Sequence, residues 1–553
     1  VASGPVSFMN IINTVTEVVK QGGKRRGANM GIMEVWHPDI ERFVTNKTEP
    51  GVLENFNVSV GVWKDFWDIL VNSGDGKYTL RSPKDNTPAG EINAHHLIDL
   101  IAQSAWKSAE PGLIFFDNIN KYNVFAKARG GPLRATNPCG EQSLYPYESC
   151  NLGSINLANL VKRTADGQYE FDWQRYEETV RKTTRYLDNI IDVNLYPVPE
   201  INVASKESRR IGLGVMGVAD LLYKLRISYN SKEGYDFQLK LAEALTYYSM
   251  EESVALSKSR GEFPLCSKTE YPDGKIPVSG YYEKPKQEQY YDWDALIEKI
   301  QKYGIRNVLT TTVAPTGTLS MLADCSNGME PNFALVFEKR VTVGRFFYTN
   351  KIFEDVLKEN NLYSEELLAK IADNYGSVKG LSEVPDWIQN IFVTAMDIHW
   401  SDHLLAQAVW QDWIGNAIAK TINMPNDVTA DDVKASYLLA HEMGLKGITV
   451  YRDGSRHKQV LHMASEDSVK TFDVTPSDYL VSYISNNIKN DYVKSQINNA
   501  LASIKLEDSH KTTQVIVEEE KEETLCPTCK NKLIFVEGCN ICIDCGYSGC
   551  TSG

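Results

Sequence analysis

The feature that most constrains the fold is an alternation of helical patterns and short apolar runs, which extends over roughly the first 450 residues. Apolar residues recur at helical spacing from 97 to 105, and Pro111 and Gly112 follow as a stop signal. The next residues, 113–116, are all apolar and have the length of a buried strand. A chain that repeats this order is predicted to be an α/β protein with a large central sheet or barrel.

Two further helices are expected from the same spacing. One carries apolar residues from Ile11 to Val19 and is expected to stop at Gly22 and Gly23, before a strand at 30–35. The other carries apolar residues from Tyr176 to Ile191.

The chain divides by composition into three parts. Residues 1–460 contain the alternating pattern and form the expected catalytic body. Residues 461–525 are polar, are expected to be partly helical, and include an acidic run at 518–523 that is typical of a solvated linker. Residues 526–553 form a separate cysteine-rich module, which is too small to hold a hydrophobic core without a metal.

Charge and hydropathy exclude several classes of protein. The net charge of -14 argues against general binding to nucleic acid, because phosphates repel an acidic surface. No apolar run is long enough to span a membrane, and the N-terminus has no signal-peptide pattern. These features predict a cytoplasmic protein whose polyanionic ligand is small.

Of the 10 cysteines, those that crowd between Cys526 and Cys550 indicate metal or redox chemistry rather than structural disulfides. Two CxxC pairs offer four thiolates to a tetrahedral Zn²⁺, and their ligands would be Cys526, Cys529, Cys542 and Cys545. This set leaves Cys539 and Cys550 free for redox chemistry. A competing set, Cys526, Cys529, Cys539 and Cys542, would instead leave Cys545 and Cys550 free. A zinc ribbon that only folds the tail or contacts a partner is an equally open interpretation.

A second candidate site is the segment 137–141, which brings an amide, a thiol and a carboxylate close together. In an extended strand, Asn137, Cys139 and Glu141 would point to the same side. Such a row can hold hydroxyls, supply a sulfur and act as a general base. On this stretch alone, a buried structural cysteine beside a turn is the commoner explanation. Cys150, further along, is compatible with a position across a hairpin from Cys139 or with core packing.

A third candidate follows an expected strand at 308–312 and consists of Ala314, Pro315, Thr316, Gly317 and Thr318. Hydroxyls and free backbone N–H groups at a strand-to-helix turn favour the binding of a phosphate. The Lys of a Walker A loop is absent, and a Thr N-cap without a ligand explains this stretch equally well.

Two further patterns are not interpreted as ligand sites. Gly212, Gly214 and Gly217 spell GxGxxG, but two arginines stand where a buried strand should end, so close packing explains these glycines better than a dinucleotide. His399 and His403 have helical i, i+4 spacing but no nearby glutamate to complete a metal motif, so they are interpreted as hydrogen-bonded or exposed histidines.

In their order and spacing, these segments together are similar to the large subunit of ribonucleotide reductases, and most of the chain takes part in the resemblance. Residues 137–141 and 147–154 resemble the family's active-site finger loop and the strand after it, and 314–320 resemble its substrate phosphate turn. The run 21–29 resembles the loop through which a bound dNTP or ATP effector sets substrate choice; its candidate residues are Gln21, Gly22, Gly23, Lys24, Arg25 and Arg26.

The resemblance implies a ten-stranded α/β barrel of two half-barrels, followed here by a small zinc-ribbon module. It implies that Cys139 becomes a thiyl radical that abstracts the ribose 3′-hydrogen, while Glu141 takes the 3′-hydroxyl proton and Asn137 holds the sugar hydroxyls. Cys150 would be one of two thiols that reduce the ribonucleotide and end as a disulfide. Thiols of the tail and a thioredoxin- or glutaredoxin-like protein would then reduce that disulfide by exchange.

Two features favour the adenosylcobalamin-dependent class of this family. The cysteine-rich tail is typical of many cobalamin-dependent members, and residues 447–454 lack the tyrosine pair that di-iron enzymes place before Arg-Asp-Gly. The radical would come from Co–C homolysis of adenosylcobalamin beside Cys139, and the enzyme would be a homodimer. The alternatives are a class I large subunit that uses a separate di-iron partner, and a non-catalytic zinc-ribbon protein that binds nucleotides.

One departure from the family pattern concerns the second redox thiol. The family places the partner of Cys150 on the first barrel strand, and the sequence starts after that strand. We therefore expect the barrel to lack its first strand here, and we expect the 553 residues to be inactive without an upstream segment of the same enzyme.

Overall fold

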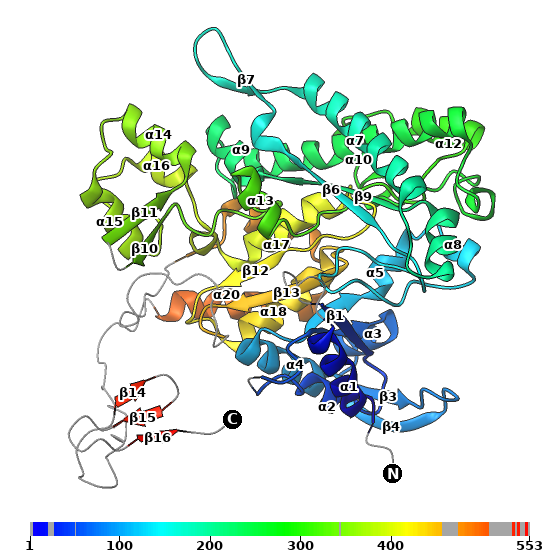
Figure 1. Cartoon of the computed structure of the whole chain (residues 1–553). Helices are drawn as coiled ribbons and strands as arrows, with labels where there is room; N and C mark the ends of the chain where they lie inside the picture. Colours follow the sequence, from blue (N-terminus) through cyan, green and yellow to red (C-terminus); the bar gives the residue numbers. More distant parts are fainter. Residues whose placement is uncertain are drawn as a thin grey trace. The chain divides into compact units, whose positions relative to one another are not determined.

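The computed structural model describes residues 4–19, 27–49, 51–341, 344–455 and 474–507, together with three short strands near the C-terminus. By its internal contacts the chain separates into two units, Val1–Leu501 and Ala502–Gly553. The first unit mixes helices with short strands, as the alternating sequence pattern predicts (Figure 1). The α/β class is therefore confirmed.

The central element of the first unit is a sheet with the strand order β1-β2-β5-β13-β12. Its strands are β1 (Asn29–Glu34), β2 (Phe56–Val62), β5 (Gly112–Phe115), β12 (Thr421–Met424) and β13 (Gly447–Arg452). β1, β2 and β5 are parallel, β13 runs antiparallel to β5, and β12 is parallel to β13. The sheet thus contains two parallel groups that run in opposite directions.

A second parallel pair, β6 (Asn151–Asn156) and β9 (Ile211–Met216), is linked to this sheet through single bridges. Leu213 of β9 bridges to Thr311, and Val313 bridges to Ile418, just before β12. The expected strand at 308–312 therefore takes part in pairing through Thr311 without forming a regular strand of its own. Strand pairing runs from β1 to β6, and the described residues do not form a closed barrel.

Amphipathic helices pack against these strands (Figure 1). α7 (Trp173–Val193) packs on β6 and β9, while α4 (Ala94–Ser108) and α18 (Ala430–Glu442) pack against β13. The apolar faces that the spacing predicts are buried in α4 and α7. In α1 (Pro5–Val18) the apolar face is instead exposed, and its Ile11, Val15 and Val18 side chains are 60%, 55% and 76% exposed.

A small lobe, residues 332–395, has a hydrophobic core of its own. It contains the hairpin β10 (Val336–Val341) and β11 (Gly344–Thr349), and the helices α14 (Lys351–Glu359), α15 (Glu365–Asp373) and α16 (Asp386–Ile391). Tyr223 of α9 (Val218–Leu225) belongs to the same core, so the lobe packs on α9.

The other regular elements of the first unit connect or cover these parts. They are α2 (Ile40–Val44), α3 (Lys64–Asn72), β3 (Lys77–Arg81), β4 (Pro88–Asn93), α5 (Phe116–Lys121), α6 (Ala126–Arg129), β7 (Val161–Arg163), β8 (Tyr169–Phe171), α8 (Pro199–Ser208), α10 (Lys232–Arg260), α11 (Ser279–Glu283), α12 (Trp293–Tyr303), α13 (Gly317–Ala323) and α17 (Trp400–Gln411). No helix in the described part of the chain is long and apolar enough to cross a membrane.

Beyond residue 460 the chain contains two helices and a short sheet. α19 (Asp478–Asn487) and α20 (Asp491–Glu507) bury Leu480, Ile484 and Ile497 in the main core. The second unit contains three antiparallel strands, β14 (Ile534–Val536), β15 (Cys539–Ile541) and β16 (Ser548–Cys550), in which Cys539 is the register partner of Cys550. The expected zinc ligands, Cys526, Cys529, Cys542 and Cys545, lie outside the described residues, so the zinc site stays a prediction.

Candidate active site

Residues 136–143 form a tight hairpin, which we call the finger loop. Thr136 and Ser143 pair across it as an antiparallel bridge, and the Gly140 N–H donates to the Asn137 carbonyl at 3.0 Å. Gly140 has φ +81°, a backbone conformation that glycine adopts without steric cost. The segment is therefore a turn, and the expectation of an extended strand with three side chains on one side is wrong.

The turn brings an amide and a carboxyl group into direct contact. Asn137 Nδ2 donates to Glu141 Oε1 at 2.8 Å. Glu141 Oε2 is buried and has no hydrogen-bond partner among the described residues. Burial raises the pKa of Glu141 above its ordinary value of 4.5. A buried carboxyl group with a vacant acceptor atom is suited to exchange a proton with a ligand hydroxyl.

Cys139 lies at the finger loop and faces a cavity of about 240 Å³. Pro315, from the candidate phosphate turn, lines the same cavity, so the fold brings these two predicted sites together. Cys139 is an exposed residue at the mouth of this cavity. Partial desolvation of its sulfur, with a smaller contribution from Glu141, raises the pKa of Cys139 to about 11. The thiol therefore keeps its proton at neutral pH, which suits hydrogen-atom transfer better than thiolate chemistry.

The residues 314–318, which we call the anion turn, connect the bridge at Val313 to α13. Ala314 and Thr316 are buried, whereas Pro315, Gly317 and Thr318 are exposed. The backbone N–H and the hydroxyl of Thr316 both donate to Asn327 Oδ1 at 2.8 Å. A Cβ added at Gly317 would meet no atom within 4 Å, so the backbone is open at the start of the helix. This openness leaves room for a ligand beside the first helical N–H groups.

Two largely buried ion pairs contribute Glu110, Glu330 and Lys420 to the lining of the Cys139 cavity, and sequence reasoning missed both. Lys420 Nζ donates to Glu330 Oε2 at 2.7 Å and lies 3.0 Å from His403 Nδ1. Glu110, which also lines the cavity, pairs with Lys47, and its Oε1 accepts the Val58 N–H at 3.0 Å. Each of these residues is isolated in the sequence, so no local motif signals them.

His399 and His403 are hydrogen-bonded, as expected for structural histidines. His403 Nε2 contacts the Ala395 carbonyl at 2.9 Å, and His399 Nδ1 contacts the Ser401 hydroxyl at 2.6 Å. Among the described residues, no group of three or more His, Cys, Asp or Glu side chains is arranged to hold a metal ion.

Cys150 lies directly before β6 and lines a different, mainly apolar cavity of about 330 Å³. Ile190, Ile191 and Tyr196 surround it there, and Cys139 does not. Burial raises the pKa of Cys150 to about 12. The described structure therefore does not place the two cysteines in one cavity. The predicted effector residues, Gln21 to Arg26, lie outside the described residues.

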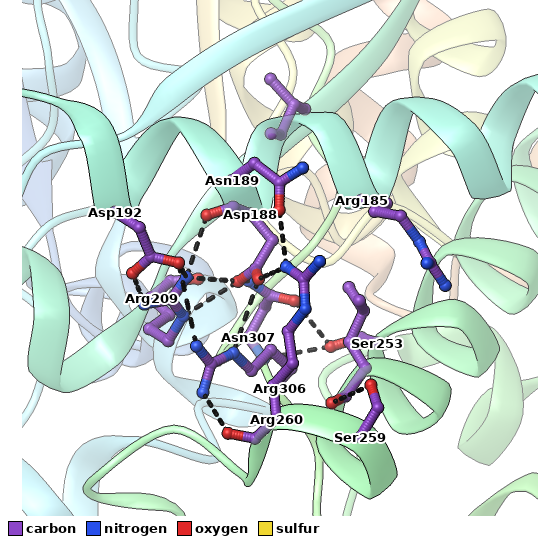
Figure 2. Close-up of polar contacts among 12 residues, drawn as sticks. Arg185, Asp188, Asn189, Asp192, Arg209, Ser253, Ser259, Arg260, Arg306 and Asn307 are labelled. Atoms are coloured by element: carbon purple, nitrogen blue, oxygen red, sulfur yellow. Dashed lines mark hydrogen bonds and ion pairs between the residues drawn. The ribbon is translucent and has the colours of Figure 1, made fainter.

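The two arginines before the GxGxxG pattern belong to buried ion pairs. Arg209 Nε donates to Asp188 Oδ1 at 2.9 Å, and its Nη1 donates to Asp192 Oδ1 at 2.7 Å (Figure 2). Arg210 Nη2 donates to Glu148 Oε2 at 3.0 Å. The contacts of Arg209 hold α7 against the start of β9, and the contact of Arg210 does the same for the segment that follows the finger loop.

The glycines of this pattern allow a close approach of neighbouring segments. A Cβ added at Gly214 would lie 2.3 Å from the Thr312 carbonyl oxygen, and one at Gly212 would lie 2.6 Å from Leu152. The interpretation of these glycines as close-packing residues is therefore confirmed.

Comparison with known families places this geometry in context. Residues 1–451 match the model of the ribonucleotide reductase barrel domain.

The chain is also similar to several curated proteins. The vitamin B12-dependent ribonucleoside-diphosphate reductase of Thermoplasma acidophilum is 43% identical over 474 residues, which cover 85% of this chain and 57% of that protein. The protein of the same name from Mycobacterium tuberculosis is 39% identical over 465 residues, covering 84% of this chain and 62% of that protein. The vitamin B12-dependent ribonucleotide reductase of Rhodopirellula baltica is 29% identical, covering 85% of this chain and 49% of that protein.

The chain thus spans between 49% and 62% of the length of these relatives. The family match covers most of the chain, and it includes the finger loop, the anion turn and the strands that surround the Cys139 cavity. The chain therefore belongs to the ribonucleotide reductase family, whose barrel domain it carries.

Proposed function

We propose that this chain is the catalytic barrel portion of an adenosylcobalamin-dependent ribonucleotide reductase, which converts ribonucleotides to deoxyribonucleotides. One observation carries the proposal: Cys139 faces the cavity that Pro315 of the anion turn also lines, and Asn137 and Glu141 lie on the same finger loop. A sugar held between the loop and the turn would meet the Cys139 thiol directly, while the acid and the amide lie on the same loop but outside the lining of the cavity.

The finger loop would carry out the chemistry on the ribose. Cys139, as a thiyl radical, would abstract the 3′-hydrogen and later return it. Glu141 would accept the 3′-hydroxyl proton, and its vacant, buried Oε2 supports this role. Asn137, which already holds Glu141, would also hold a sugar hydroxyl. The 2′-hydroxyl would leave as water, while two thiols lose two electrons and two protons and join as a disulfide.

The anion turn would hold the phosphates of the substrate. Gly317 and Thr318 are exposed at the start of α13, where backbone N–H groups have no partner within the helix. Ala314 and Thr316, which are buried, would shape the turn from inside, and Pro315 would face the cavity.

Cys150 would be one of the two reducing thiols. Its partner thiol would come from another segment of the enzyme, which would also complete a ten-stranded barrel.

The tail would return the electrons to Cys150. Opposite residues of antiparallel strands have Cα atoms about 4.5–5.5 Å apart, which is within the range of a disulfide. The register of Cys539 with Cys550 therefore supports them as the redox pair of the tail. It favours the zinc set Cys526, Cys529, Cys542 and Cys545, and a thioredoxin- or glutaredoxin-like protein would reduce the tail in turn.

The Cys139 cavity fits the cofactor that the similar proteins name. Gly140 leaves open space beside Cys139, since the atom nearest to an added Cβ is 3.9 Å away. Ser59, Gly447 and Thr449, which also line the cavity, are small, and none of the residues around this cavity is aromatic. We infer that these residues would hold the adenosyl group of adenosylcobalamin. When bound, the cofactor would supply the radical through homolysis of its Co–C bond.

The exposed apolar face of α1 supports the proposed homodimer. Ile11, Val15 and Val18 would be covered by a second copy of the chain, since such a stripe is costly in water. The proposed effector loop, Gln21 to Arg26, follows this helix in the sequence and would bind dNTP or ATP.

The decisive experiment replaces the reacting sulfur. In the complete natural polypeptide, supplied with adenosylcobalamin, ribonucleotide and a dithiol, Cys139→Ser should reduce deoxyribonucleotide formation to background, because a hydroxyl does not replace the thiol in radical transfer. Cys266→Ser, at a core cysteine outside the cavity, is the matched control and should stay active. Product formation and Co–C cleavage are measured on the same samples. Sustained product formation by Cys139→Ser would refute the proposed function.

A further inference from the structure

The anion turn is held by a chain of hydrogen bonds that begins at a buried carboxylate, Asp220. Asp220 lies in the first turn of α9 and is 4% exposed. Its Oδ2 accepts the Ser326 N–H at 2.8 Å, and its own N–H donates to Ser326 Oγ at 3.2 Å. The carboxylate therefore fixes the backbone of the segment that follows α13.

The next residue of that segment, Asn327, supports the anion turn directly. Its Oδ1 is the acceptor for both the N–H and the hydroxyl of Thr316. Thr316 Oγ1 in turn accepts the Gly328 N–H at 2.7 Å. Because α13 starts at Gly317, a shift of Asn327 would move the first N–H groups of this helix.

The second oxygen of Asp220 faces the small lobe. Oδ1 accepts hydrogen bonds from Asn332 Nδ2 and Asn350 Nδ2, both at 2.9 Å. The Asn332 carbonyl accepts the Ala395 N–H, so this residue joins the two ends of the lobe. Asn350 caps α14 by accepting the Phe353 N–H. One carboxylate thus connects the lobe to the segment that supports the anion turn.

We propose that Asp220 is a positioning residue for phosphate binding, which couples the small lobe to the anion turn through Ser326 and Asn327. This inference rests on the proposed function, because it takes the turn as the phosphate site. Three N–H donors converge on Asp220, from Ser326, Asn332 and Asn350. Only a group with two acceptor oxygens satisfies all of them, so an amide would press its own NH₂ against a donor in either orientation.

The test variant is Asp220→Asn, which changes the side chain by one group. A reciprocal exchange, Asp220→Asn with Asn350→Asp, restores complementarity with Ser326 and residue 350, because the new amide donates to the new carboxylate while its oxygen accepts from Ser326. Asn332 then has to turn its own amide so that its oxygen accepts from the new NH₂ group. An aspartate at 350 remains a good N-cap for α14. The matched control is Asp324→Asn, at an exposed carboxylate of the same segment, whose ion-pair partner among the described residues is Lys351.

Binding is measured in the complete natural polypeptide as protection of Cys139 from iodoacetamide, followed by peptide mass spectrometry, at an alkaline pH where part of the thiol is ionised. Cytidine diphosphate is the probe, and cytidine is the probe without phosphates. Alkylation of Cys266 in the same samples reports unfolding, since this core cysteine is 1% exposed.

Asp220→Asn should raise the diphosphate concentration for half-protection about ten-fold, with the value for cytidine unchanged and with Cys266 still protected. The reciprocal exchange should return the diphosphate concentration for half-protection to within about two-fold of the parent value, and Asp324→Asn should leave this concentration unchanged. An unchanged diphosphate value, an equal change for cytidine, or an exchange that restores nothing would overturn the inference.

Turnover on the same samples separates this inference from the proposed function. Protection by the diphosphate without deoxycytidine diphosphate formation would count against the reductase activity alone, and the Asp220 comparison would still decide the inference. Absence of protection in the unaltered polypeptide would overturn both.

Discussion

Two buried polar clusters of the first unit differ in whether their polar atoms have hydrogen-bond partners. In the Asp188 cluster, which comprises Asp188, Asp192, Arg209, Arg306 and Asn307, every buried side-chain nitrogen and oxygen has a partner (Figure 2). In the finger loop, Glu141 Oε2, both amide atoms of Gln142 and Ser143 Oγ are buried with no partner in the described chain. A buried polar atom without a hydrogen-bond partner costs free energy of folding, and such atoms persist where a bound ligand supplies the partner.

The carboxyl groups of the two clusters also titrate in opposite directions. A hydrogen bond from Arg209 lowers the pKa of Asp192, whereas burial raises the pKa of Glu141. One cluster is therefore completed by the protein itself, while the other keeps unpartnered polar atoms that the proposed substrate would complete.

The largest expected effect is on turnover. Glu141→Gln should lower kcat about 10²–10⁴-fold, because an amide cannot take the hydroxyl proton. Its oxygen can still accept from Asn137, and no buried charge remains, so the thermal midpoint should not fall. Turnover and thermal unfolding are measured on one preparation. If Glu141→Gln lost stability in proportion to its loss of activity, the finger loop would serve stability as the Asp188 cluster does, and the two clusters would not differ.

The second effect is on stability alone. Asp188→Ala should lower the free energy of unfolding by about 3–5 kcal/mol, because the Arg209 guanidinium would lose its buried counter-charge. The control Asp192→Ala removes a carboxylate that is 47% exposed and should cost less than about 1 kcal/mol. Urea unfolding measures both, and kcat per folded molecule should stay the same. If the two variants lowered the free energy of unfolding equally, burial would not determine how much each ion pair of this cluster stabilises the protein.

The smallest effect concerns the pH dependence of stability, and its sign should differ between the clusters. The folded pKa of Glu141 lies above its ordinary value of 4.5, so its contribution is fully present below pH 4.5 and is lost as pH rises through the folded pKa. The folded pKa of Asp192 lies below 3.8, so its contribution is present above pH 3.8 and is lost as pH falls through the folded pKa.

Thermal midpoints of Glu141→Gln and Asp192→Asn, followed from acid to neutral pH, test these signs. Relative to the parent, Glu141→Gln should gain stability as pH rises, and Asp192→Asn should lose it. The same sign in both variants would contradict the opposed titration of the two clusters.

Some elements and parts of the site were predictable from local sequence. The spacing of apolar residues located α4 and α7 and the face that each buries, and the stop signal at Pro111 located the start of β5. The anion turn was recognisable because its hydroxyl and glycine residues are contiguous. The extended form expected for 137–141 was wrong, because the left-handed conformation of Gly140 closes the turn.

Other features depend on contacts between distant segments and leave no local signal. The same periodicity that predicts a buried face in α4 occurs in α1, where the apolar face is exposed. Glu330 and Lys420 line the Cys139 cavity only because the segments that follow α13 and precede β12 meet there.

The sequence by itself determined the class of fold, most of the helices and strands that were predicted from it, and the types of side chain available for catalysis. These are local properties, which follow from periodicity, turn residues and side-chain chemistry. The tertiary structure alone decided which of these groups meet. It placed Cys139 beside Pro315, kept Cys150 in a separate cavity and joined Asp220 to both the lobe and the anion turn. The physical reason is that such contacts follow from strand pairing and core packing across long stretches of chain, which no single window of residues contains.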